Sequence, residues 1–321
     1  IFIGGGTPSL FSPESIDRLL SSIRAYLNFN SSIEITLEVN PGTVEANRFS
    51  EYKAVGINRL SIGVQSFNDK YLKLLGRIHT SREAEKAISI CKGAGFKNFN
   101  IDLMFGLPSQ NTNDALLDLS TAFDQLPTHI SWYQLTIEPN TQFSFNPPNL
   151  PCDDNIWSMQ KEGQELLKCN DFFQYEISAY AKKKFASIHN TNYWEFGDYI
   201  GIGAGAHSKI TNFNDGKIER FSRHRVPKRY IELAGHSDVI AHKKILDSDD
   251  ISLEFMMNTL RLTNGIPANL FFERTGLHMN QIKKELKYAK DRGLLDLCGD
   301  QIVASSHGQR YLNDLLQIFM K

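Results

Sequence analysis

The sequence opens with Ile1-Phe2-Ile3-Gly4-Gly5-Gly6-Thr7-Pro8-Ser9, in which an apolar run is followed directly by three glycines. The apolar run predicts a buried β-strand, and the glycines predict a turn whose bare backbone can approach a ligand closely. Backbone N–H groups in such a turn can face a carboxylate or a phosphate. Because a chain rarely starts inside a core strand, we expect further residues upstream of Ile1.

A strand-like run followed by a helix-like segment recurs from residue 1 to about residue 181, which is typical of parallel βα units. The strands are expected at Ile1–Ile3, Ile33–Val39, Leu60–Val64, Phe99–Phe105 and Ile130–Ile137, with a possible extra strand at Tyr175–Ala179. Ser12 followed by Pro13 predicts the start of a helix. Gly56 and Gly95 predict helix ends just before the next strand.

The βα rhythm stops near residue 181. Residues 182–249 are interpreted as a loop-rich connecting region, and residues 250–321 as a winged-helix-like domain. Within that domain the sequence predicts helices at Leu253–Leu262, Ala268–Arg274 and Asn280–Gly293, a hairpin at Leu297–Ala304 and a last helix. DNA binding is not expected, because phosphate affinity needs a concentrated basic face and the lysines after Asn280 are partly balanced by acidic residues.

The composition of the 321 residues excludes several classes of protein. Lys and Arg total 35 against 36 Asp and Glu, so no global basic field indicates a nucleic-acid partner. No apolar run approaches the roughly 18–20 residues that a membrane span needs. The four cysteines, Cys91, Cys152, Cys169 and Cys298, lack C-x-x-C spacing and predict reduced thiols in a cytoplasmic protein, without a metal site.

Polar groups or glycines stand at the carboxyl ends of the predicted strands, where parallel α/β folds bind their ligands. One acidic residue at a strand end is often only a helix N-cap, but several in register indicate a site. Glycine N–H groups suit a carboxylate, Glu38 suits an amine or a ribose hydroxyl, and Arg77 supplies a fixed charge. Gln65 and Asp102 add hydrogen-bonding groups. Together these residues suit a zwitterionic ligand that carries a ribose.

The motifs Gly4–Ser9, Leu37–Pro41, Ser61–Phe67 and Ile101–Pro108 resemble the radical S-adenosylmethionine (SAM) family. Their order and spacing are most similar to the oxygen-independent coproporphyrinogen III oxidase group, over nearly the whole chain. The resemblance implies a partial (βα)6 barrel that lacks its first strand here, followed by the winged-helix-like domain. It also implies that SAM binds at Gly4, Gly5, Gly6, Thr7, Glu38, Gln65, Arg77 and Asp102.

The same resemblance implies a [4Fe–4S] cluster, held by a C-x-x-x-C-x-x-C loop, and an electron donor for it. That loop is absent from the sequence and is expected upstream of Ile1. The chain as written is therefore expected to bind SAM weakly or not at all and not to cleave it. A homodimer is compatible with the family, although no residue pattern demonstrates one.

The stretch His189-Asn190-Thr191-Asn192-Tyr193-Trp194 resembles the H-N-x-x-Y-W motif of the haem chaperone branch of this group. The resemblance implies a protein that binds haem and transfers it to acceptor haemoproteins. A neutral imidazole can ligate haem iron, and aromatic rings can cover the macrocycle, so His189, Tyr193 and Trp194 are the expected haem residues. His207 is the second candidate ligand.

Two other functions stay open at this point. One is the oxidative decarboxylation of coproporphyrinogen III by a SAM-derived radical, and the other, less expected, is DNA-binding regulation. The Gly201–Gly205 run is not followed by a G-x-G-x-x-G helix start. It therefore predicts tight packing of backbone against the barrel rather than a nucleotide site.

Overall fold

The structure, a computed structural model, describes residues 1–42, 46–212 and 214–320. The chain divides into two compact units, the N-terminal unit of residues 1–189 and the C-terminal unit of residues 190–321. The finer division at residues 181 and 249 stays a prediction. Within the described residues, no helix combines the length and the apolar character that crossing a membrane requires.

A seven-stranded sheet organises the N-terminal unit, in the order β1-β2-β3-β4-β5-β7-β6. Strands β1 to β5 are parallel neighbours in chain order, so each helical connection moves one strand along the sheet. The bounds are β1 (Phe2–Ile3), β2 (Thr36–Val39), β3 (Arg59–Gln65), β4 (Asn98–Phe105), β5 (His129–Gln134), β6 (Phe173–Glu176) and β7 (Ala179–Ala181).

The possible single strand at Tyr175–Ala179 is wrong in its extent. The structure has an antiparallel hairpin there, in which β7 pairs with both β5 and β6. Ile177 and Ser178 form the turn, and the Glu176 carboxylate accepts the N–H of Ser178 at 3.1 Å. The sequence pattern did not predict the turn, because residues 175–179 contain neither Gly nor Pro, the strongest turn signals.

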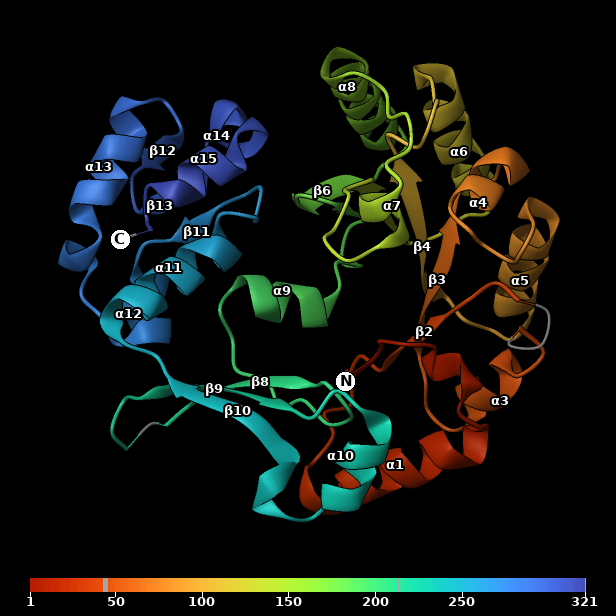
Figure 1. Ribbon diagram of the computed structural model, residues 1–321, viewed down its shortest axis with the longest axis horizontal. Coiled ribbons are helices and arrows are strands. Elements are labelled where there is room, and N and C mark those ends of the chain that lie inside the picture. The colour runs from red at the N-terminus through yellow and green to blue at the C-terminus, as the bar shows by residue number, and fades with distance from the viewer. Residues whose placement is uncertain (43–45, 213, 321) are drawn as a thin grey trace. The chain divides into compact units, whose positions relative to one another are not determined.

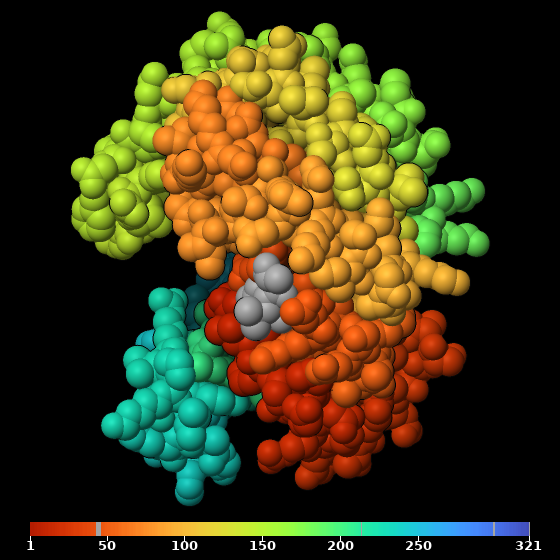
Figure 2. All heavy atoms as spheres, turned by 90° about the vertical axis from the view of Figure 1, so that its right-hand side faces the viewer, coloured from red at the N-terminus to blue at the C-terminus, as the bar shows by residue number. Residues whose placement is uncertain are grey.

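Helices cover one face of this sheet (Figure 1). In Figure 2, which views that face, side chains of the segments from α1 (red) to α6 (yellow) form a layer over the strands. Ser12 caps α1 as expected, since its hydroxyl accepts the N–H of Ser15. The helices are α1 (Pro13–Tyr26), α3 (Phe49–Ala54), α4 (Asp69–Leu74), α5 (Ser81–Gly93), α6 (Thr112–Asp124), α7 (Gln142–Phe145) and α8 (Asp153–Cys169), with a short 3-10 turn, η1 (Pro8–Leu10).

Alternate residues of the parallel strands point to opposite faces of the sheet. The apolar set, which includes Leu60, Ile62 and Ile101, belongs to the buried core of this unit. The other set is polar and equally buried, as Arg59, Asn100 and His129 show. The sheet therefore has an apolar face under the helices and an inner face made of polar side chains.

The C-terminal unit contains a three-stranded antiparallel sheet where the sequence predicted loops. Helix α9 (Ile188–Trp194) precedes it, and the strands are β8 (His207–Thr211), β9 (Ile218–Arg223) and β10 (Ile240–Ile245). The prediction of a loop-rich region was wrong because these strands are rich in Lys, Arg and His, so apolar alternation is weak. Helix α10 (Pro227–Leu233) and the turn η2 (Ser237–Val239) connect β9 to β10.

The rest of the C-terminal unit confirms the expected helices and hairpin. Phe255 and Phe271 are fully buried in its core and meet edge to face at 5.1 Å. The last helix is in fact two short ones, with a break at Tyr311. The elements are α11 (Ser248–Thr259), β11 (Ile266–Pro267), α12 (Asn269–Thr275), η3 (Met279–Gln281), α13 (Lys283–Asp291), β12 (Leu295–Cys298), β13 (Gln301–Ala304), α14 (Ser306–Arg310) and α15 (Leu312–Gln317).

A substitution at Gly163 of α8 can test how tightly the helical layer packs on the sheet. A Cβ atom there would lie 1.9 Å from Cη2 of the buried Trp132. We expect Gly163→Ala to lower the free energy of unfolding by about 1–3 kcal/mol, because the indole has no room to move. The matched control is Gly93→Ala at the end of α5, where a Cβ atom meets nothing within 4 Å. Urea unfolding measures both, and equal stability of the two variants would contradict the packing argument.

Candidate functional site

The glycine turn after β1 lies against Glu38 of β2. The N–H of Gly5 donates to Oε2 of Glu38 at 3.0 Å. A Cβ atom on Gly4 would lie 2.7 Å from that oxygen and 2.9 Å from the Phe2 ring, so position 4 has no room for a side chain. Gly5 and Gly6 have φ values of +80° and +61°, which favour glycine. The half-buried Thr7 ends the turn, and its carbonyl accepts the N–H of Leu10.

Arg77 and Gln65 lie together at the end of β3. The Arg77 guanidinium donates to Oδ1 of Asn40 at 2.8 Å and to the carbonyl of Gly63 at 3.2 Å. A Cβ atom on Gly63 would lie 3.1 Å from Nε2 of Gln65 and 3.7 Å from Nη2 of Arg77. Gln65 has a φ of 71°, and the register to β4 shifts just before it. Such irregularities at a strand end redirect a side chain, which is common beside ligand sites.

Asp102 lies in a hydrogen-bonded group on the inner face of the sheet. Nδ2 of Asn100 donates to Oδ1 of Asp102 at 2.7 Å and to Oγ of Ser61 at 2.7 Å. The Ser61 hydroxyl in turn donates to Oδ2 of Asp102 at 3.3 Å. Both carboxylate oxygens are therefore held by neighbours from β3 and β4.

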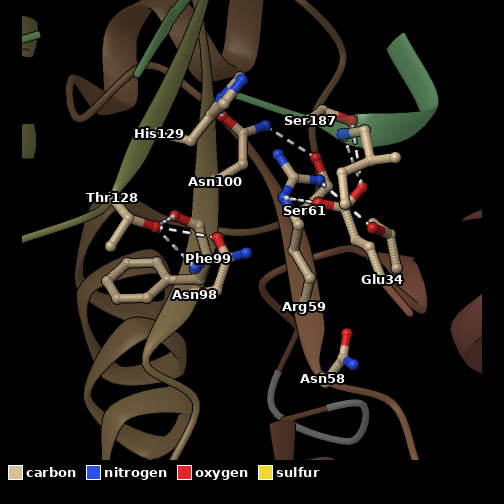
Figure 3. Close-up of polar contacts among 12 residues, drawn as sticks. Glu34, Asn58, Arg59, Ser61, Asn98, Phe99, Asn100, Thr128, His129 and Ser187 are labelled. Atoms are coloured by element: carbon tan, nitrogen blue, oxygen red, sulfur yellow. Dashed lines mark hydrogen bonds and ion pairs between the residues drawn. The ribbon is translucent and has the colours of Figure 1, made fainter. Parts of the chain in front are cut away.

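His129 extends this group away from the strand ends. Its Nδ1 lies 2.6 Å from Oδ1 of Asn100, which also accepts the Ser131 hydroxyl. Because that amide oxygen can only accept, Nδ1 bears the proton and Nε2 accepts the Tyr175 hydroxyl at 2.8 Å. Burial, with a smaller effect of Arg59, lowers the pKa of His129 well below its usual value, so the ring is neutral. Figure 3 shows Asn100 between His129 and Ser61.

Our sequence analysis missed Asn100, His129 and Ser131. The signal was present, since polar residues alternate with apolar ones along both strands that supply them. Alternation normally indicates a solvent-exposed face, whereas here the polar face is buried.

The inner face is closed near the start of β3 by a buried ion pair. Arg59 is 2% exposed, and its Nε lies 3.9 Å from Oε2 of Glu34. Oε1 of Glu34 accepts the N–H of Ile188 at 3.1 Å and the Ser187 hydroxyl at 3.4 Å. As Figure 3 shows, Glu34 lies between Arg59 and Ser187. The start of α9 is thereby attached to the N-terminal unit.

His189 follows directly on that attachment. Its ring stacks on the Phe2 ring, with centroids 4.6 Å apart and planes 20° from parallel. Burial lowers the pKa of His189 to about 4, with Arg59 also contributing. The imidazole is therefore neutral near pH 7, which is the form that can ligate a metal.

The aromatic residues of the same motif pack within the C-terminal unit. The Tyr193 ring stacks on Tyr199 at 4.2 Å. The Arg261 guanidinium lies 4.4 Å from the Trp194 ring centroid. The contacts described for these residues are to three different partners, Phe2 for His189, Tyr199 for Tyr193 and Arg261 for Trp194. His207, the second candidate, is exposed on β8.

Electrostatics distinguish Asp102 from the other polar groups. Burial raises the pKa of its carboxyl from 3.8 to about 6, against the lowering effect of nearby hydrogen-bond donors, of which the Asn100 amide is the first. The Glu38 charge raises this pKa further, and Arg59 opposes it. Glu38 and Asp102 therefore form one acidic side of the candidate site.

Comparisons with known proteins identify the family of the fold. Residues 1–120 match the Radical SAM superfamily, and residues 246–311 match the HemN C-terminal domain. The chain is similar over 99% of its length to the solved structure of coproporphyrinogen III oxidase (HemN) from Escherichia coli, with a TM-score of 0.81, 21% identity and 76% of that chain covered. The family matches and the fold therefore define a radical SAM protein.

Sequence relatives narrow the assignment. The chain is 48% identical over 320 residues to the haem chaperone HemW of Haemophilus influenzae, covering 100% of this chain and 82% of that protein. HemW of Escherichia coli is 47% identical over 320 residues, which cover 100% of this chain and 83% of that protein. Radical S-adenosyl methionine domain-containing protein 1 of Mus musculus is 36% identical over 227 residues, 70% of this chain and 51% of that protein. The chain belongs to the HemW family.

The superfamily uses two cofactors, SAM and an iron–sulfur cluster, and the described residues suit only SAM. The glycine turn, Glu38, Gln65, Arg77 and Asp102 offer the donors and acceptors that an amino acid and a ribose need. In the part of the chain that the structure describes, no group of His, Cys, Asp or Glu is arranged to hold a metal. These described residues therefore do not provide ligands for an iron–sulfur cluster.

The raised pKa of Asp102 predicts a pH dependence of stability. The folded state binds the proton more tightly than the unfolded state, so the wild-type chain should lose stability relative to Asp102→Asn as the pH rises from about 4 to about 6. Urea unfolding at a series of pH values measures this difference. Asp17→Asn, at an exposed position of α1, is the control and should follow the wild type. If the free energies of unfolding of wild type and Asp102→Asn changed with pH in the same way, that result would contradict the raised pKa.

Proposed function

We propose that this protein receives haem and transfers it to acceptor haemoproteins, as a radical SAM protein that also uses SAM and a [4Fe–4S] cluster. The observation that carries this proposal is the 48% identity to a haem chaperone over the full length of the chain. The neutral, half-buried imidazole of His189 supports it, because haem iron accepts such a ligand.

The strand-end residues would hold SAM. The N–H of Gly5 occupies one oxygen of Glu38, which leaves the rest of that carboxylate to accept from an amine or a ribose hydroxyl. Arg77, fixed by Asn40 and Gly63, would face the carboxylate of the methionyl group. Asn100 and Ser61 would hold Asp102 in one orientation toward the ribose or the amine. When bound, SAM supplies a sulfonium group that can be cleaved reductively.

His189 would ligate the haem iron. Its stacking on Phe2 restricts the orientation of the ring, and its lowered pKa means that no proton has to leave before iron binds. Tyr193 and Trp194 stay candidates for covering the macrocycle. An electron donor for the cluster, a homodimer and a cytoplasmic location also stay predictions.

The competing function is oxidative decarboxylation of coproporphyrinogen III. The structural likeness to HemN of Escherichia coli favours it, but at 21% identity that likeness shows the fold alone. Conversion of coproporphyrinogen III by the cluster-containing, full-length gene product at enzymatic rates would replace the chaperone proposal.

Replacing His189 with Ala should weaken haem binding while the barrel stays folded. A haem titration of the full-length gene product, followed by its Soret absorbance, measures the effect. His236→Ala, at an exposed position before β10, is the matched control and should titrate like the wild type. An unchanged Soret spectrum in the His189 variant would place the ligand elsewhere, with His207 the next residue to substitute.

Replacing Glu38 with Ala should reduce SAM affinity about tenfold or more, because a charged group that accepts hydrogen bonds is lost. Glu38→Gln should have an intermediate effect, since it keeps an acceptor for Gly5 but loses the charge. Calorimetric titration of the cluster-containing, full-length gene product with SAM measures both variants. Glu51→Ala, at an exposed position of α3, is the control. Identical affinities in all four proteins would exclude Glu38 from the site.

A further inference from the structure

A cavity of about 450 Å³ lies over the three-stranded sheet of the C-terminal unit. We call it the β8–β10 cavity. His207 of β8 and His242 of β10 both pair with Ser222 of the central strand, so the three residues share one face of the sheet. The cavity is lined by His207, Arg220, Phe221, Ser222, Arg223, His224, Arg225, Ala241, His242, Lys243 and Lys244.

The described lining residues include arginines, lysines and histidines but no carboxylate. Several of these cations are neutralised by acidic groups outside the lining. Arg220 pairs with Glu254 at 2.5 Å, Lys244 with Asp250 at 2.5 Å and Lys243 with Glu219 at 2.9 Å. These pairs use charge that would otherwise attract an anion.

Arg223 and Arg225 differ from the other cations. Nε of Arg223 donates to the carbonyl of Gly201 at 2.8 Å, which fixes the guanidinium and leaves its other nitrogens available. Arg225 is exposed, and its Cγ lies 3.6 Å from the position a Cβ atom on Gly205 would take. Neither arginine has an ion pair within the part of the chain that the structure describes.

The Gly201–Gly205 run forms the backbone next to this cavity. A Cβ atom on Gly201 would lie 2.0 Å from the carbonyl oxygen of His207, so only glycine allows this approach. The N–H of Gly203 donates to the Tyr230 hydroxyl at 3.1 Å, and that of Gly205 donates to the carbonyl of His224 at 2.9 Å. The backbone of this run packs tightly as predicted, but the partner found within the C-terminal unit is β8 and not the barrel that the prediction named.

We infer that the β8–β10 cavity binds the carboxylate side chains of haem through Arg223 and Arg225. Guanidinium groups bind carboxylates with two parallel hydrogen bonds, and two uncompensated guanidinium groups match a ligand with two propionates. Arg223 lies on the sheet face opposite to His207 and His242, together with Phe221, whose ring centroid is 6.0 Å from the Arg223 guanidinium. The Phe221 ring offers an aromatic surface to the macrocycle of such a ligand. The inference rests on the proposed function, because it takes haem as the ligand.

The test compares wild type with Arg223→Gln/Arg225→Gln in the full-length gene product. We expect the double variant to bind haem about tenfold or more weakly, because charge-assisted hydrogen bonds are lost. Haem dimethyl ester, whose propionates are blocked, should bind wild type and double variant with equal affinity. Lys228→Gln, an exposed cation of α10 outside the lining, is the matched control and should bind haem like the wild type.

Three outcomes would overturn the inference. The first is equal haem affinity in the double variant and the Lys228→Gln control, and the second is equal affinity of wild type for haem and its dimethyl ester. The third is full displacement of haem by inorganic phosphate at millimolar concentration, which would show a general anion site. Should the double variant fail to fold, Arg225→Gln alone alters only an exposed side chain and gives the same comparison.

These results separate the inference from the proposed function. Haem binding that is lost in His189→Ala but kept in the arginine variants would support the chaperone proposal and exclude the β8–β10 cavity. Haem binding that is weakened in the arginine variants and kept in His189→Ala would support the cavity and move the iron ligand to it. A wild-type protein that binds no haem would exclude both.

Discussion

The N-terminal unit depends on one constraint: helices cover only one face of its sheet, and the other face is buried although its side chains are polar. A buried polar group is costly unless it has a hydrogen-bond partner. Arg59, Asn100 and His129 are each at most 2% exposed, so they must satisfy one another or their neighbours. Asn100 and His129 do so in a connected group, whose members restrict each other to one arrangement, whereas Arg59 is paired with Glu34 and its Nε has no hydrogen-bond partner among the described residues.

That arrangement explains the geometry of the candidate site. Asp102 receives hydrogen bonds from Asn100 and Ser61, and Asn100 is oriented by His129. The carboxylate is thereby presented in a fixed direction, and its burial keeps its pKa near neutrality. A ligand that binds there does not need to order the protein first, which is the general advantage of a preorganised site. The glycine turn and Glu38 give the same rigidity on β1 and β2.

The H-N-x-x-Y-W stretch lies where one unit ends and the other begins. Glu34 holds the start of α9 in the N-terminal unit, where His189 stacks on Phe2, while Tyr193 and Trp194 contact residues of the C-terminal unit. The motif therefore combines a candidate iron ligand with packing residues of the next unit. The β8–β10 cavity adds a set of cations whose charges are only partly neutralised within that unit.

The sequence by itself determined the parallel strands, the glycine turn, the N-cap at Ser12 and the hairpin of the winged-helix-like domain, because each depends on residues close together in the chain. The candidate site residues at the strand ends also followed from the order of residues along the chain. Only the tertiary structure decided that Tyr175–Ala179 turns back as a hairpin and that residues 207–245 form a sheet. It also decided the link from Tyr175 through His129 and Asn100 to Asp102. Such links join residues 29 and 46 positions apart, and no local pattern specifies which distant polar group will satisfy a buried one.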